Sequence, residues 1–96
     1  MPVPHPEDAE FVEIDDANEQ HLAERGVTPA EVHQVFLGDP LWAPNLKGRT
    51  ATWLMIGRTD GGRPLVVMVN YDEVRAALRP ITARTCDRDE VSKWSL

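Results

Sequence analysis

The stretch WLMIGRTDGGRPLVVMVNY, residues 53–71, carries the strongest structural pattern in the chain. Both of its ends are apolar and rich in β-branched and aromatic residues, as expected of strands that are buried on both faces. Between them, TDGGR supplies the Asp-Gly-Gly signal of a hairpin turn. The stretch therefore predicts two antiparallel strands at the centre of a sheet.

The flanking sequence extends this sheet on both sides. Residues 76–84, AALRPITAR, predict a third strand. Pro80 cannot donate a hydrogen bond to a neighbouring strand, so this strand is expected at a sheet edge or at a bulge. Residues 41–46, LWAPNL, fit a short earlier strand that Pro44 interrupts.

Helix signals stand before and after the predicted strands. Asp15 or Asp16 can cap a helix through DANEQHLAER, residues 16–25, and Thr28 opens a capping box for a second helix that ends at Gly38. Asp87 can cap a short last helix. The sequence thus predicts an α+β fold: an N-terminal helical hairpin packed on a three- to four-stranded antiparallel sheet, followed by a short C-terminal helix.

Length and composition indicate one domain. The 96 residues suffice for a single core, with residues 1–10 expected as a flexible arm and residues 11–96 as the domain. No apolar stretch is long enough to span a membrane. The single cysteine, Cys86, excludes an intrachain disulfide and indicates a cytoplasmic protein without a cysteine-based metal cluster. We expect no cofactor.

Charge is distributed unevenly along the chain. Residues 1–40 hold ten acidic residues and one basic residue, a balance of −9, whereas residues 41–96 hold nine basic and six acidic residues, a balance of +3. The total of −6 argues against non-specific nucleic-acid binding, which depends on phosphate neutralisation. A fold that separates the two halves can still present one basic face.

Basic and aromatic side chains are the candidates for a binding site. Arg79 and Arg84 share a face of their strand only if Pro80 introduces a bulge. Their ordinary role would be in solubility or salt bridges, and their functional role would be to bind phosphate through the planar guanidinium fork. The candidates for substrate binding near the first long strand are Lys47, Arg49 and Trp53, the last as a stacking surface for an unpaired base or as a core residue.

Three segments together resemble the BrnT-like toxins. NEQHLAERGVTPAEV, residues 18–32, is similar to their entry motif of Asn-x-x-His, a basic residue, Gly-Val and a capping Ser/Thr. WLMIGRTDGGRPLVVMV, residues 53–69, resembles their strand–turn–strand segment. RPITAR, residues 79–84, with Glu90 and Trp94 after it, is similar to their closing signature. The resemblance runs from Phe11 to Trp94.

The resemblance implies the toxin component of a bacterial type II toxin–antitoxin system with a RelE-like ribonuclease fold, in complex with an antitoxin or as a homodimer. Such toxins cleave messenger RNA without a metal: the 2′-hydroxyl attacks the adjacent phosphate, and basic side chains stabilise the phosphorane. Carried over by position, Arg84 binds the phosphate with support from Arg79, and His21 transfers protons because its ordinary pKa lies near neutrality. Glu90 is an acid–base group or orients Arg84 through a salt bridge.

Two alternatives remain open at this point. The acidic total charge is compatible with a non-catalytic protein-interaction module that retains the toxin fold. The other alternative is a plain nucleic-acid-binding protein, whose affinity for RNA should fall steeply with salt.

Overall fold

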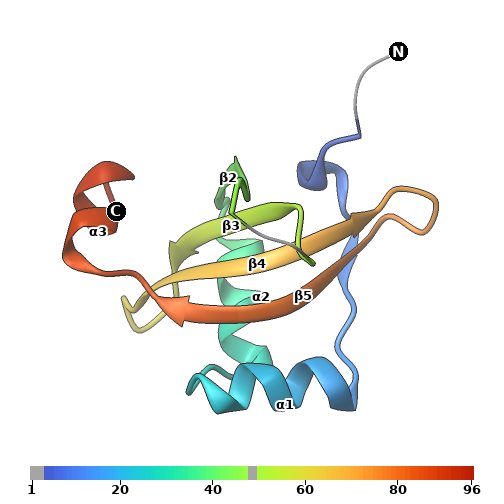
Figure 1. Ribbon diagram of the computed structural model, residues 1–96, viewed down its shortest axis with the longest axis horizontal. Helices are drawn as coiled ribbons and strands as arrows, with labels where there is room; N and C mark the ends of the chain where they lie inside the picture. Colours follow the sequence, from blue (N-terminus) through green and yellow to red (C-terminus); the bar gives the residue numbers. More distant parts are fainter. Residues whose placement is uncertain (1–3, 48–49) are drawn as a thin grey trace.

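The fold was determined as a computed structural model that describes residues 4–47 and 50–96 (Figure 1). It is an α+β arrangement in which helices flank one twisted sheet. Along the described chain the elements are η1 (Pro6–Asp8), β1 (Phe11–Val12), α1 (Asp16–Glu24), α2 (Pro29–Leu37), β2 (Leu41–Pro44), β3 (Trp53–Arg58), β4 (Pro64–Asp72), β5 (Ala77–Thr85) and α3 (Arg88–Lys93).

The sheet of the described chain has five strands in the order β1-β5-β4-β3-β2. The pairs from β2 to β5 are antiparallel, as the turn signals predict, but β1 runs parallel to β5, with Val12 beside Leu78. The prediction of a purely antiparallel sheet of three to four strands is therefore wrong. The two residues of β1 are too few to show any local strand pattern, and they join the sheet only through a strand far away in the sequence.

Side-chain caps start the three α-helices. Asp15, Thr28 and Asp87 each accept a hydrogen bond from the backbone N–H three residues on, and the residue at that position bonds back to the cap. These reciprocal bonds satisfy backbone donors that a helix start leaves free. The helices predicted from these caps are therefore present.

The two N-terminal helices do not form the predicted hairpin. α1 packs mainly on β5, and α2 packs on β3. In Figure 1 they lie on the same side of the sheet but point in different directions. The prediction is wrong because each helix directs its apolar side chains, such as Leu22 of α1 and Val35 of α2, to the sheet rather than to the other helix.

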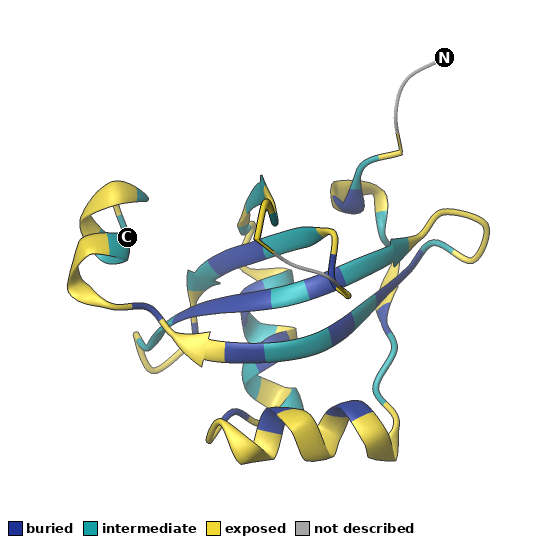
Figure 2. Cartoon of the chain, viewed as in Figure 1, coloured by how far each residue is buried: buried dark blue, intermediate teal, exposed yellow. Residues whose placement is uncertain are grey.

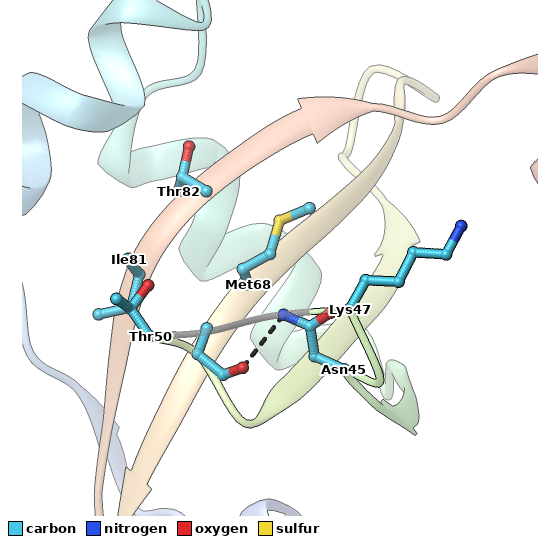
Figure 3. Close-up of a pocket in the computed structure, with 7 residues that line it drawn as sticks. Asn45, Lys47, Thr50, Met68, Ile81 and Thr82 are labelled. Carbon is cyan, nitrogen blue, oxygen red and sulfur yellow. Dashed lines mark hydrogen bonds between the residues drawn. The ribbon is translucent and has the colours of Figure 1, made fainter.

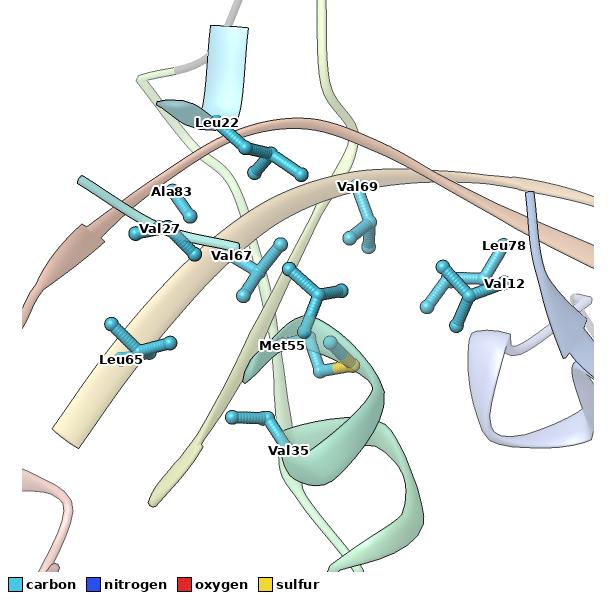
Figure 4. Close-up of a cluster of buried hydrophobic side chains, with 11 residues drawn as sticks. Val12, Leu22, Val27, Val35, Met55, Leu65, Val67, Val69, Leu78 and Ala83 are labelled. Carbon is cyan, nitrogen blue, oxygen red and sulfur yellow. The ribbon is translucent and has the colours of Figure 1, made fainter. Parts of the chain in front are cut away.

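The main core lies between these helices and the sheet (Figure 4). Leu22, Val35, Met55 and Val67 are almost completely buried there. Burial of each such side chain contributes about 1.5–3 kcal/mol. A smaller cluster on the other side of the sheet joins Ile56, Val66 and Cys86 to Val91, Trp94 and Leu96, and thereby fixes α3 there. Figure 2 shows buried residues along β4 and an exposed outer surface on α1.

A bulge in β5 controls which side chains share a face. Met68 of β4 pairs with Thr82, but Val69 pairs with Pro80, so Ile81 has no partner. Residues directly opposite each other on paired strands project to the same face. Because Arg84 pairs with Val66 and Arg79 with Asn70, both arginines project to the face away from α1 and α2. We call this the open face.

The start of the chain, expected as a flexible arm, contacts the domain. Pro6 of η1 is buried, and the His5 ring lies 4.8 Å from the Trp53 ring, centroid to centroid. No helix in the described part of the chain has both the length and the apolar character needed to cross a membrane.

Candidate functional site

The open face carries a hollow of about 370 Å³ beside α3. Its floor includes Leu54 of β3, Met68 of β4 and Trp94 at the end of α3. Charged side chains from three segments line it: Lys47, Arg84, Glu90 and Lys93. We call this the α3 hollow. Three cations and one carboxylate give its lining a balance of +2, opposite in sign to the chain as a whole.

Arg84 and Glu90 form a bidentate ion pair at the hollow. The Arg84 Nη1 and Nη2 atoms donate to the two carboxylate oxygens of Glu90 at 2.5 and 2.7 Å. Glu90 also accepts a hydrogen bond from the backbone N–H of Asp87 at 3.0 Å, so the start of α3 holds the carboxylate in place. The sequence left two roles open for Glu90, and the geometry is that of the salt bridge.

The ion pair shifts the pKa values of both partners. Hydrogen bonds from the Arg84 guanidinium lower the pKa of Glu90 to about 2, and the pKa of Arg84 is raised by the same contact. Glu90 is therefore a fixed negative charge at neutral pH and a weak base. A guanidinium has five N–H donors, and Glu90 occupies two of those of Arg84. The remaining three have no hydrogen-bond partner in the described part of the chain and can donate to a second anion.

A second hollow of about 290 Å³ adjoins the first along the open face (Figure 3). The two share Asn45, Lys47 and Met68, and the second is completed by residues at the β5 bulge, Ile81 and Thr82. In Figure 3 the Lys47 side chain extends away from the bulge, whereas Asn45 donates a 3.1 Å hydrogen bond to the Ala51 carbonyl. Together the two hollows form a depression lined by residues of four strands, β2 to β5.

Arg79 projects to the same face but lies apart from the α3 hollow. It lies five positions before Arg84 along β5, or roughly 15 Å away. Its guanidinium is held at the β1 edge by Asp15 at 2.7 Å and Glu13 at 3.4 Å. Glu13 also pairs with Arg75. The pKa of Glu13 is lowered, chiefly by the hydrogen bond from Arg75, and the ion pairs of this cluster join the segment after β1 to β5 and to the turn before it.

Of the other predicted site residues that the structure describes, only Lys47 lines the α3 hollow. His21 is exposed on α1, on the opposite side of the sheet, with its Nδ1 atom 3.7 Å from Glu24. Trp53 pairs with Val69 and packs toward the main core. Arg49 lies outside the described residues. The lining contains no histidine among the residues described.

Sequence reasoning missed one charged residue of the α3 hollow, Lys93, although its spacing from Glu90 was a signal for it. Lys93 follows Glu90 by three positions, a spacing that places both side chains on one face of a helix. Its ammonium group lies 5.4 Å from the centroid of the Trp94 ring. In the described ranges, no group of three or more histidine, cysteine or carboxylate side chains is arranged to hold a metal ion.

In comparisons with known proteins, no family model and no curated protein sequence matches this chain.

Proposed function

We propose that this protein binds single-stranded RNA on its open face and is the toxin component of a type II toxin–antitoxin system, cleaving messenger RNA without a metal. The observation that carries the proposal is the concentration of Lys47, Arg84 and Lys93 around one hollow of an otherwise acidic protein. Its motif support is the resemblance of the three segments to BrnT-like toxins. We do not propose the RelE-like fold that the resemblance implies.

In this proposal the RNA phosphate lies against the free N–H groups of Arg84, with Glu90 holding the guanidinium plane in position. The 2′-oxygen of the ribose attacks phosphorus and the 5′-oxygen leaves. Lys47, Arg84 and Lys93 stabilise the additional negative charge of the phosphorane. Because the described lining supplies no imidazole, we propose that water in the open hollow transfers the protons. We assign no role to His21 in this reaction.

Expression in a bacterial host tests the catalytic part. Wild type should slow growth and shorten transcripts, and Arg84→Ala should relieve both effects. Arg25→Ala is the matched control, since Arg25 is an exposed arginine next to α1 on the opposite side of the sheet. Equal growth and intact transcripts with wild type and Arg84→Ala would refute the cleavage reaction.

RNA affinity tests the binding part separately. A single-stranded RNA oligonucleotide should bind with an affinity that falls with salt, and each cation that contacts a phosphate contributes about 0.7 to the logarithmic slope. Lys47→Ala and Lys93→Ala should each reduce the slope by about that amount. An unchanged slope in both variants would exclude the α3 hollow as the phosphate site.

A second candidate function is a non-catalytic protein-interaction module. It is favoured by one observation: Arg79 and Arg84 are both paired with carboxylates. This candidate predicts normal growth, intact transcripts and no RNA binding at low salt. A short adjoining reading frame with a DNA-binding motif would instead favour the toxin.

A further inference from the structure

A groove of about 340 Å³ lies at the β2 edge of the sheet, on the helix side. Its apolar lining comes from Phe36 and Leu37 at the end of α2 and from Trp42 of β2. Two carboxylates, Glu7 and Asp39, complete its lining together with Ala9 and Pro40. We call this the edge groove.

The edge groove exposes one large apolar side chain. Leu37, in its lining, is 78% exposed. An exposed leucine beside Phe36 and Trp42 offers a partner an apolar contact in a groove that also holds two carboxylates. The main core does not need Leu37, because Val32 and Val35 already fill the side of α2 that faces the sheet.

Among the described residues, β2 also has a free backbone edge. It is hydrogen-bonded to β3 on one side and is the last strand of the sheet on the other. An edge strand presents unpaired N–H and C=O groups that an extended peptide can match by adding a strand. The groove and the free edge therefore offer side-chain and backbone contacts to the same segment.

The charge of the edge groove selects among possible partners. Within the described chain, neither Glu7 nor Asp39 pairs with a lysine or arginine. The last turn of α2 contains no basic residue, so its terminal carbonyls add further negative potential. A second copy of this chain would bring the same carboxylates together across a shared β2 edge, and RNA would bring phosphates. Both are electrostatically unfavourable.

We propose that the edge groove binds an extended basic segment of a protein partner, which adds a strand to β2. An apolar side chain of the segment lies against Leu37, Phe36 and Trp42, and its lysine or arginine side chains pair with Glu7 and Asp39. The site is separate from the α3 hollow, which is on the open face, so both can be occupied at once. This inference does not depend on the proposed function. If the protein is the toxin of a toxin–antitoxin system, the partner is the antitoxin.

The test uses a dye-labelled seven-residue peptide of alternating lysine and leucine, with a glutamate–leucine peptide as its counterpart. Fluorescence anisotropy should show binding of the basic peptide alone, and amide chemical shifts should change along β2 and at the end of α2. The double variant Leu37→Ser/Asp39→Asn should weaken binding at least tenfold. Asparagine suits this position because Asp39 has a φ of 59°, which asparagine also adopts.

The matched control is Val74→Ser/Glu73→Gln, which removes an aliphatic side chain that is 91% exposed and one carboxylate from the turn between β4 and β5. It should bind the peptide as wild type does. Equal binding by the two double variants, or shift changes confined to other elements, would overturn the proposal. So would a wild-type dimer in sedimentation that Leu37→Ser dissociates, because the occupant would then be a second copy. Arg84→Ala should retain peptide binding, so a failure of the RNA proposal leaves this result unaffected.

Discussion

Replacing Glu90 by glutamine removes the charge of the Arg84–Glu90 ion pair while keeping the shape of the side chain. In the wild type, the carboxylate accepts two hydrogen bonds from Arg84 and one from the backbone N–H of Asp87. Glutamine keeps one carbonyl oxygen that can still accept from the cap or from Arg84. The Glu90→Gln variant therefore isolates the contribution of the negative charge.

The pKa of Glu90 sets an upper limit on that contribution. It falls from an ordinary value of 4.5 to about 2, and at about 1.4 kcal/mol per unit this corresponds to roughly 3 kcal/mol of stability. Water screens the pair, because the Arg84 side chain is 46% exposed although that of Glu90 is only 16% exposed. We therefore expect a loss of about 1 kcal/mol in the free energy of unfolding at pH 7. In a domain of this size, that lowers Tm by about 4–8 °C.

The sign of the pH dependence follows from the direction of the shift. A carboxyl whose pKa is lower in the folded state stabilises the fold at pH values above its unfolded pKa of 4.5, and this stabilisation is lost as the pH falls toward 2. Glutamine does not titrate. The difference in stability between wild type and Glu90→Gln should therefore be constant above about pH 5 and should shrink below it.

Urea unfolding at pH 7 and pH 3 measures this difference. We expect the full loss at pH 7 and less than half of it at pH 3. Asp89→Asn is the matched control, since it removes an exposed carboxylate from the same turn of α3 and should cost only a few tenths of a kcal/mol. An equal loss at both pH values, or no loss at pH 7, would refute the electrostatic reasoning.

Three further predictions concern the core, a cap and the thiol. Leu22→Ala should lower the free energy of unfolding by about 2–5 kcal/mol in urea, because Leu22 is fully buried; a loss below 1 kcal/mol would mean that α1 is not held through it. Thr28→Ala should cost about 1 kcal/mol, since Thr28 accepts from the Glu31 N–H, whereas Thr28→Ser should cost much less; equal losses would exclude the cap. Burial raises the pKa of Cys86, which is 7% exposed, so a thiol reagent should label it slowly at pH 7 and rapidly in urea; equal rates would contradict its burial.

The sequence predicted those elements whose signals are local. The cap signals at Asp15 or Asp16, at Thr28 and at Asp87 locate the three α-helices of the described chain to within a residue or two, and the Asp-Gly-Gly turn locates β3 and β4. It did not predict β1, because a parallel pair between Val12 and Leu78 depends on contacts that no window of sequence contains. It assigned α1 and α2 to a hairpin because helix amphipathicity shows that a face is buried but not what buries it.

The candidate site was predictable to a similar degree. Pro80 indicated an edge or a bulge, and the bulge next to it is what places Arg79 and Arg84 on one face. The carboxylates that hold Arg79 come from the other end of the chain, Glu13 and Asp15, and no spacing rule joins them to β5. His21 was expected at the site from its place in the entry motif and from the chemistry of an imidazole, and the structure places its helix on the opposite side of the sheet.

The parallel pairing of β1 with β5 imposes an order of events during synthesis on the ribosome. Residues 11–12 are translated early, yet the strand that receives them is made only when the ribosome reaches residues 77–78. Until then the nascent chain can form its capped helices and the β3–β4 hairpin. The carboxylates of Glu13 and Asp15 cannot yet pair with Arg79, because Arg79 has not been made. Arg79 and Arg84 belong to this same late strand. The strand that completes the sheet therefore also brings Arg84 to the α3 hollow, and this hollow cannot form before the sheet is closed.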